Sequence, residues 1–373
     1  MKRTLKFVIP MVAAFSTQAI EPLPQQPDNE LAAANHYSAY VFGDFSTGSG
    51  NANGALGVGG DLSIGGYSVA TDGKTLTSGY GLVVEGRGHF SNGRLYGGKV
   101  RVQGEVDFSY AVLAGLPSGT EIENQPLASS ISQTKAYYQD VSKQLSEAPI
   151  NGSTEFKWGG LYLKGDCSSP NQVFNVDGAQ LGRAHTFDVS CIPDNANVIF
   201  NITGDSLIFQ KKSLSTLIPH RENTIFNFHQ ANSIRTAGIS IEGVVLAPNA
   251  DIEAPHGDAQ ATVIAQSWTG SMHLGSVRFK GDLSDLVSFN EAPVIVSEPP
   301  LQIVWPNDYS YAVVAEDADQ DPISYALLSG PEKATINQWT GLYLGLPAKL
   351  NQGSMRSQLK HRMMKGSSIH KTL

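Results

Sequence analysis

Residues 56–66 read Leu-Gly-Val-Gly-Gly-Asp-Leu-Ser-Ile-Gly-Gly, a stretch in which aliphatic residues alternate with small or polar ones and end at glycines. Alternation of this kind places the aliphatic side chains on one face of an extended strand. The glycine that follows lets the backbone bend or pack closely against a neighbour. The stretch therefore predicts two short strands that end at glycine corners.

The same five-residue pattern, two of Val, Ile, Leu or Phe alternating with any residue before a glycine, occurs nine times. Its glycines are Gly60, Gly66, Gly86, Gly104, Gly165, Gly178, Gly204, Gly243 and Gly281. Those at 165, 204, 243 and 281 lie 39, 39 and 38 residues apart, which indicates a repeat. The pattern does not recur after Gly281.

Short strands punctuated by glycine favour a β-solenoid (β-helix), in which each turn buries its apolar face against neighbouring turns. The inner positions would then be Val58, Val84, Val102, Leu163, Ile202, Ile241 and Phe279. A β-sandwich, whose hairpin turns also use glycine, is the competing arrangement. We expect a mainly β protein in which a solenoid-like domain forms the larger part.

One stretch, residues 127–147, lacks glycine and proline and predicts a long helix. Its less polar residues recur at three- and four-residue intervals and form one stripe, while polar residues such as Gln133, Lys143 and Gln144 would face water. The stripe consists of Leu127, Ile131, Thr134, Tyr138, Val141 and Leu145. We expect this helix to pack against the β domain, although the stripe would also suit a partner.

A second domain is expected at 290–350, because prolines crowd the segment after residue 288 and the glycine pattern is absent. Residues 309–327 contain two alternating strands around an acidic turn, which predicts a small β-sandwich. Residues 351–373 are basic, contain no acidic residue and lack alternation. We expect a disordered tail there and an incomplete sandwich before it.

The first residues predict export. Lys2, Arg3 and Lys6 precede an apolar run from Phe7 to Phe15, and small residues end at Ala19. The run is far shorter than the roughly 20 apolar residues that cross a membrane, so we interpret 1–19 as a cleaved signal peptide. The net charge of −8 opposes binding to nucleic acid.

Cys167 and Cys191 are the only cysteines. Outside the cytoplasm an oxidised pair can persist, so we expect one structural disulfide. Two buried free thiols are the alternative.

Asp317, Asp319 and Asp321 alternate along an extended segment, which would place three carboxylates on one face and suit calcium. The segment lacks the glycine and terminal glutamate of an EF-hand loop, so other ligands would have to come from elsewhere. A solvated turn stabilised by its own aspartates explains the same residues. Calcium is the one cofactor that the sequence indicates.

A catalytic alternative centres on His256 and Asp258, close in sequence to Asp251 and Glu253. A glycosidase or lyase on a solenoid would need such acid-base groups side by side. An ordinary exposed corner has the same composition, and nothing in the segment selects a nucleophile. We therefore assign no catalytic residue.

Two weaker binding signals remain. Aromatic residues that could stack on sugar rings are Tyr67, Tyr80, Tyr96, Trp158 and Trp268, although scattered aromatic residues more often belong to a core. Ice binding would need a flat ladder of Thr-x-Thr motifs, and only Thr75-Leu76-Thr77 has that form.

Four segments resemble the choice-of-anchor A family of exported bacterial proteins. They are Val41 to Phe45, Gly57 to Leu62, Gly243 to Asp251 and Val277 to Gly281, and the resemblance covers about residues 36–286. It implies surface display in adhesion or matrix formation and supplies no catalytic residues. The second domain resembles cadherin-like and immunoglobulin-like modules through residues 315–325 and 336–342.

Together these observations predict a secreted or cell-surface structural protein that binds an extracellular matrix, glycan or surface-protein ligand without catalysis. A carbohydrate-active enzyme on a β-helix remains the alternative.

Overall fold

The computed structural model describes residues 31–73, 76, 79–126, 130–288, 293–299, 309–317, 322–327, 334–345 and 367–371. Contacts divide the chain into two compact units, with the boundary between Val287 and Ser288. The predicted signal peptide lies outside the described residues.

The larger unit is a solenoid built from parallel strands, which confirms the predicted fold class. Its first face has ten strands, in spatial order β12 (Asn171–Asp177), β14 (Asn197–Thr203), β16 (Thr224–Asn227), β19 (Val244–Glu253), β21 (Val263–Thr269), β1 (Tyr37–Val41), β3 (Ala55–Val58), β5 (Tyr80–Val84), β7 (Lys99–Val102) and β9 (Ile122–Glu123).

The second face combines the C-terminal parts of β19 and β21 with six further strands, β15 (Ser206–Gln210), β17 (Ser233–Ala237), β2 (Phe45–Asn51), β4 (Leu62–Val69), β6 (Gly88–Leu95) and β8 (Val106–Phe108). The third face is made of two smaller sheets. One consists of β10 (Ser153–Lys157), β11 (Gly160–Lys164) and β13 (Thr186–Ser190), and the other of β18 (Ser240–Ile241), β20 (Asp258–Ala261) and β22 (His273–Val277).

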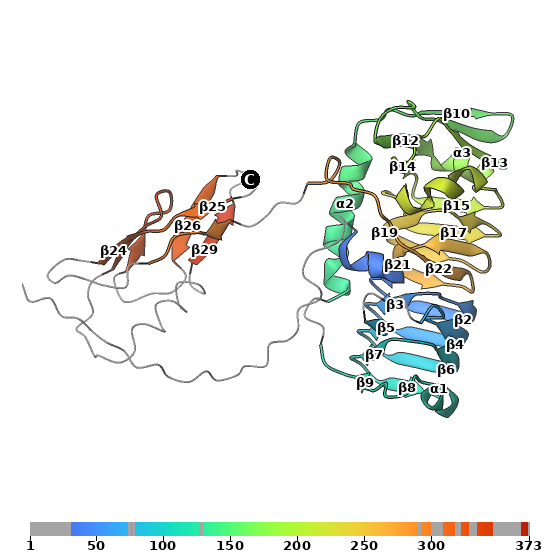
Figure 1. Cartoon of the computed structure of the whole chain (residues 1–373), viewed down its shortest axis with the longest axis horizontal. Helices are drawn as coiled ribbons and strands as arrows, with labels where there is room; N and C mark the ends of the chain where they lie inside the picture. Colours follow the sequence, from blue (N-terminus) through green and yellow to red (C-terminus); the bar gives the residue numbers. More distant parts are fainter. Residues whose placement is uncertain are drawn as a thin grey trace, which may run out of the picture. The chain divides into compact units, whose positions relative to one another are not determined.

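The chain enters the solenoid in the middle of the stack. Strands β1 to β9 wind from there to one end, α2 (Lys135–Glu147) runs alongside to the other end, and β10 to β22 wind back to the middle (Figure 1). At the seam between the halves, β21 pairs in parallel with β1, with Ala39 beside Val263. The helix α1 (Tyr110–Ala114) and the hairpin β10–β11 cover the two ends, which limits unpaired strand edges.

Alternation fills the interior with ladders of like side chains. Phe174, Phe200 and Phe226 are in register on neighbouring turns, and their rings stack with centroids 5.3 and 5.1 Å apart. Six of the seven predicted inner positions, from Val58 to Ile241, belong to this core and are each at most 3% exposed. The seventh, Phe279, is also buried but follows the last strand, β22, so its prediction as an inner strand position is wrong. Burial of such ladders against neighbouring turns is the main stabilising contribution that a solenoid has.

Glycines form one corner of the solenoid, as the pattern predicts. The amides of Gly60, Gly86 and Gly104 each donate to the carbonyl of the glycine one turn before, at 2.9, 2.9 and 3.1 Å, beginning with Gly43. A Cβ on Gly104 would lie 2.5 Å from the Gly86 carbonyl oxygen, closer than real contacts allow. Only glycine lets successive turns approach so closely at this corner.

Two details of the pattern are wrong. Gly66 lies within β4 and is not a corner, whereas Gly178 follows β12 directly, beside Gly204 of the next turn, and begins the short helix α3 (Gly178–Arg183). The 38–39-residue spacing is not a turn length, since Phe174 pairs with Phe200, 26 residues on, and Val245 with Val263, 18 residues on. Turns differ in length because α3 and the 3-10 helix η3 (Ser215–Asn223) replace strands in some of them.

The predicted helix is present as η2 (Ser132–Thr134) followed by α2, while residues 127–129 lie outside the described residues. It packs against β14, β16 and β19 on the first face. Tyr138, Val141 and Leu145 of the predicted stripe are buried, together with Ser142. The Tyr138 hydroxyl donates to the Leu31 carbonyl and accepts from the Ala34 amide, fixing η1 (Ala32–His36) against the helix.

Residues 278–287, which we call the strap, leave β22 and run along the solenoid toward its β12 end. The backbone of Phe279 exchanges two hydrogen bonds with the Asn35 side chain, at 2.8 and 2.9 Å. The Lys280 amide donates to the Glu222 carbonyl at 2.7 Å. The Asn197 side chain donates to the Asp282 carbonyl at 2.6 Å.

The smaller unit contains short antiparallel pairs. Its strands are β23 (Val294–Ile295), β24 (Tyr309–Ala312), β25 (Ala315–Glu316), β26 (Ile323–Leu327), β27 (Thr335–Ile336), β28 (Leu342–Gly345) and β29 (Ser367–Lys371). Tyr311, Val313 and Tyr343 form its buried cluster. Residues 367–371, which lie within the predicted tail, pair with β26.

Candidate binding surface

The second face presents one continuous line of outward side chains. Because side chains alternate across a strand, the neighbours of buried Leu62 and Trp268 point to solvent. In strand order this line, the outward ladder, consists of Ile208, Arg235, Glu253, Thr269, Ser46, Ser63, His89 and Asp107. It crosses eight parallel strands, spaced by about 4.8 Å, and continues across the seam without a shift.

The centre of the outward ladder is small and uncharged. Thr269, Ser46 and Ser63 carry hydroxyls, and Gly48 and Gly65 lie beside them on the same strands. A Cβ on Gly65 would lie 2.9 Å from the Gly48 carbonyl oxygen. The strip is therefore low in relief.

Ion pairs occupy the two sides of this centre. Arg235 pairs with Glu253. His89 Nδ1 lies 2.7 Å from Asp107 Oδ2, and Arg87 lies 3.0 Å from the same oxygen. Hydrogen bonds from His89 and then Arg87 hold the pKa of the Asp107 carboxyl below its usual value. Charged side chains thus replace hydroxyls toward both ends. The outward ladder holds a single threonine, whereas ice binding would need a ladder of Thr-x-Thr motifs.

Aspartates fix the turns beside the ladder. Asp44 Oδ1 accepts the amide of Asp61, and Asp61 Oδ1 accepts the amide of Arg87, both at 2.8 Å. Asp251 accepts from the Ser267 hydroxyl at 2.6 Å. These carboxylates satisfy donors of neighbouring turns, so they join successive turns beside the ladder.

The four residues of the catalytic alternative are divided between two faces. Asp251 and Glu253 belong to β19 on the second face, where each has the partner described above. His256 is exposed in the following corner, and Asp258 begins β20 on the third face. No group of three His, Cys, Asp or Glu side chains suited to a metal ion occurs among the described residues.

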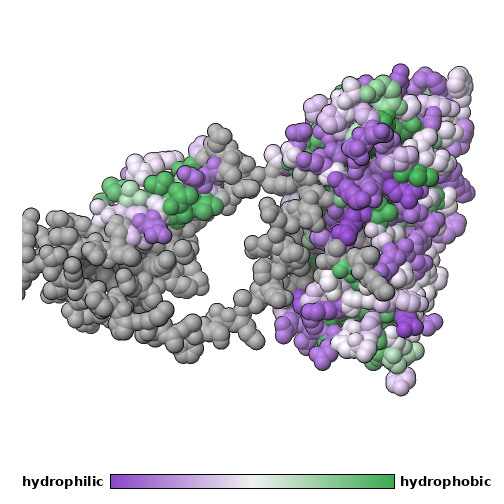
Figure 2. All heavy atoms as spheres, viewed as in Figure 1, coloured by the Kyte–Doolittle hydropathy of each residue, from purple (hydrophilic) through white to green (hydrophobic). Residues whose placement is uncertain are grey.

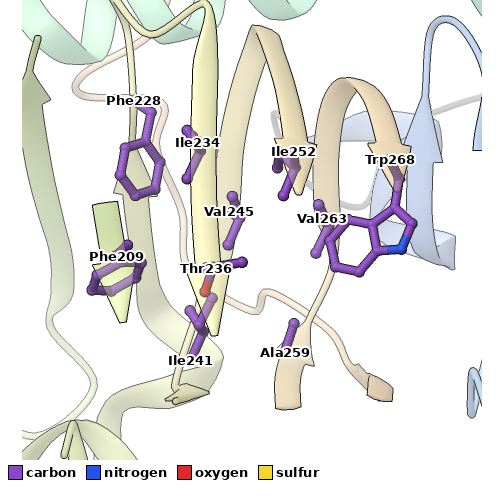
Figure 3. A pocket seen from close by; sticks show the side chains of 10 residues that line it. All are labelled: Phe209, Phe228, Ile234, Thr236, Ile241, Val245, Ile252, Ala259, Val263 and Trp268. Atoms are coloured by element: carbon purple, nitrogen blue, oxygen red, sulfur yellow. The ribbon is translucent and has the colours of Figure 1, made fainter. Parts of the chain in front are cut away.

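A small cavity lies inside the solenoid and is lined by side chains from all three faces (Figure 3). It measures about 10 Å³ and is lined by apolar side chains, including Phe209, Ile252 and Trp268. The Thr236 hydroxyl and the Trp268 indole nitrogen are buried without a hydrogen-bond partner. The cavity has space for about one water molecule. We therefore interpret it as a packing defect of the core.

A larger cavity, of about 260 Å³, lies beside the seam and is lined by polar residues such as Asn35, Asp72 and Arg278. The Ser276 hydroxyl donates to Asp72 across it. Ser38 donates to the Gly275 carbonyl and accepts the Gly54 amide. These bonds join β1 to β22 and to the turns at Gly54 and Asp72.

The aromatic candidates fall into two groups. Tyr67 and Trp268 are buried, at 0% and 1% exposure, so they belong to the core, the alternative given for scattered aromatic residues, and cannot stack on sugars. Tyr80 is half-buried between Arg101 and Glu123. Trp158, at 83%, is among the most exposed large side chains, and Tyr96 is 49% exposed.

Cys167 and Cys191 form a disulfide, with Cα atoms 4.7 Å apart. Asp317 follows β25, whereas Asp319 and Asp321 lie outside the described residues. Thr75 and Thr77 also lie outside them.

Hydrophilic residues cover most of the solenoid surface turned to the viewer in Figure 2, and the apolar areas between them are small. Residues 30–275 match the model of a family described as "Putative Ice-binding-like adhesive domain". The chain belongs to this family. The ice-binding-like adhesive domain covers the solenoid from η1 to β22, and its description supports an adhesive rather than a catalytic role. No curated protein and no solved structure matches the chain.

Sequence reasoning missed the outward ladder of this adhesive domain. Ser63 lies between the paired aliphatic residues Leu62 and Ile64, so the pattern predicts that it points outward. Ser46 and Thr269 belong to strands without the pattern. They lie side by side only because β2 pairs with β21. No helix among the described residues is long and apolar enough to cross a membrane.

Proposed function

We propose that the chain is a secreted or cell-surface adhesive protein that binds an extracellular matrix or surface ligand through the outward ladder, without catalysis. The observation that carries the proposal is the unbroken register of eight outward positions across the two halves of a rigid solenoid. A flat, regularly spaced strip suits a repetitive ligand, because many weak contacts can form together. Resemblance to choice-of-anchor A proteins supports display at a bacterial surface.

The test is retention of the full chain on immobilised matrix proteins, glycans and cell surfaces. A Ser63→Tyr/Thr269→Tyr double variant raises two bulky rings from the strip, and tyrosine is well accepted on exposed strands. The matched control is Ser215→Tyr, at an exposed serine of η3 that faces a different side.

We expect the double variant to lose retention and the control to keep it, with unchanged circular dichroism for both. Equal retention by all three proteins would refute the role of the outward ladder. Release of reducing sugar from a polysaccharide, abolished by His256→Ala or Asp258→Ala, would instead support the carbohydrate-active alternative. Export is checked separately by N-terminal sequencing of the mature protein, which we expect to begin after Ala19.

A further inference from the structure

The hairpin at the β12 end of the solenoid places a tryptophan where the backbone disfavours it. Lys157 pairs with Gly160, so Trp158 and Gly159 form a two-residue turn, with φ of 50° and 75°. A turn with positive φ at both central residues ordinarily takes Asn-Gly, because a larger L-residue is strained there. The backbone of this turn therefore gives no reason for a tryptophan, and its presence is better explained by what the indole can contact.

The turn is held rigid from the neighbouring coil. His185 Nε2 donates to the Trp158 carbonyl at 3.0 Å, and the His185 amide donates to the Gly159 carbonyl at 2.9 Å. His185 Nδ1 lies 2.9 Å from the Thr186 hydroxyl, which fixes the imidazole. A ring that is 83% exposed is therefore carried on an immobilised backbone, which lowers the entropy cost of binding.

A second ring and a cation complete the platform. The Trp158 and Tyr162 rings meet edge to face, with centroids 6.5 Å apart and planes at 80°. The Lys157 ammonium lies 5.2 Å from each ring centroid and 2.7 Å from the Glu155 carboxylate. The Lys157 ammonium lies in the angle between the two rings, and most of the indole surface remains exposed to solvent.

Carboxylates lie on both sides of the tyrosine. Strand pairing places Glu155 opposite Tyr162 on one side and Asp188 on the other. An apolar ring surface bordered by hydrogen-bond acceptors and one donor matches a ligand that is apolar on one face and carries hydroxyls around its rim. A pyranose ring has this character.

We propose that Trp158 and Tyr162, with Glu155, Lys157 and Asp188, form a binding site for a pyranose residue of a polysaccharide. The C–H face of the sugar stacks on the indole, and its hydroxyls donate to the two carboxylates and accept from the ammonium. A cationic ligand is disfavoured because Lys157 already fills the aromatic angle, and a nucleic acid because its phosphates would meet Glu155 and Asp188. The site lies at one end of the third face, apart from the outward ladder, and does not depend on it.

The test titrates the full chain with cellohexaose, xylohexaose, mannohexaose and the hexamer of N-acetylglucosamine, by calorimetry and tryptophan fluorescence. Trp158→Asn places a residue that tolerates positive φ in the turn, so the variant is expected to fold with an equal or higher melting temperature. We expect at least one hexaose to bind and Trp158→Asn to weaken it roughly tenfold or more, as loss of a stacking ring predicts. Tyr96→Ala, at another exposed aromatic residue, is the matched control and should bind normally.

Several results would overturn the proposal. The first is that no hexaose binds to the unaltered chain, and the second is that Trp158→Asn binds as well as the unaltered chain. The third is that Trp158→Asn has a markedly lower melting temperature while the unaltered chain binds no sugar. Concentration-dependent dimers that vanish in Trp158→Asn, again without sugar binding, would assign the platform to a second copy of the chain. Hexaose binding should survive in the Ser63→Tyr/Thr269→Tyr variant, so failure of one site is distinguishable from failure of the other.

Discussion

Asn227 is fully buried and links the solenoid to α2 through hydrogen bonds of its side chain. Its Nδ2 donates to the carbonyl of Ser142 and to Asn201 Oδ1, both at 2.8 Å, and its Oδ1 accepts the Ser142 hydroxyl at 2.5 Å. We expect Asn227→Ala to lower the free energy of unfolding by about 2–4 kcal/mol, because several buried groups lose their partners. Urea denaturation measures the difference.

Asn175 provides the matched control, since it pairs with Asn201 on the other side of the same ladder but is exposed. Asn175→Ala should change the unfolding free energy by less than about 0.5 kcal/mol. Similar losses in the two variants would contradict a special role for the contact with α2.

Lys212 is a buried cation, with 6% exposure. Its ammonium donates to the Gln210 carbonyl at 2.8 Å and lies 5.6 Å from the Phe209 ring centroid. Burial lowers the pKa of Lys212 to about 8. Between pH 8 and about 10.4 the unfolded chain holds more protons at this site than the folded chain, so this residue makes stability rise with pH.

Below pH 8 the penalty for the buried charge is therefore fully present. We expect Lys212→Met to stabilise the protein by about 1–2 kcal/mol at pH 7, part of the gain being offset by the lost hydrogen bond. The advantage should fade by about pH 10.4, near the unfolded pKa. Thermal unfolding at the two pH values measures it, and Lys164→Met, at an exposed position, should show neither effect. A variant that is less stable than the parent at pH 7 would contradict the prediction.

At the scale of elements, the local sequence pattern predicts where strands lie and which of their faces is buried. It does not predict which strands pair with each other. Leu62 and Ile64 alternate with the exposed Ser63, and that is enough to place them inside. Nothing local joins β1 to β21, because any aliphatic ladder could stack on any other. The buried face of α2 was predictable except for Ser142, whose partner Asn227 lies 85 residues away.

The candidate sites show the same limit. Ser63 could be assigned to an outward position from its own strand, but the line that it forms with Ser46 and Thr269 exists only after the halves meet. The sequence identified Trp158 as an aromatic residue that could stack on a sugar ring but did not indicate its surroundings. Its exposure depends on the hairpin capping an end, and its rigidity on His185 from another turn.

The disulfide is an element-scale tie at the end of the stack. Cys167 follows β11 and Cys191 follows β13, so the bond joins neighbouring turns near the capping hairpin. The two cysteines are separated by 24 residues. We expect Cys167→Ser/Cys191→Ser to lower the unfolding free energy by about 2–4 kcal/mol, the typical effect of removing a cross-link.

Denaturation with and without a reducing agent measures this effect. The reduced parent and the double variant should unfold at the same denaturant concentration. If the oxidised parent matched them as well, the bond would contribute nothing to stability.

For the whole molecule, the two units predict separable responses to calcium. If Asp317, Asp319 and Asp321 bind the ion, millimolar calcium should raise the melting temperature of the smaller unit and leave that of the solenoid unchanged. Scanning calorimetry with calcium or with a chelator measures both. Asp317→Asn/Asp319→Asn/Asp321→Asn should abolish the shift, and an undiminished shift in this variant would place the ion elsewhere.

The strap decides how an adhesive chain held through residue 288 would carry tension. The buried side chains of Val287 and Leu283 lie nearest to residue 288 and would be loaded first. The attachments at Asn197, Glu222 and Asn35 would follow in that order. These contacts would give way one after another, and each release would lengthen the tether. Mechanical work would thus be dissipated outside the coils, which would stay folded and attached to their ligand while the connection stretched.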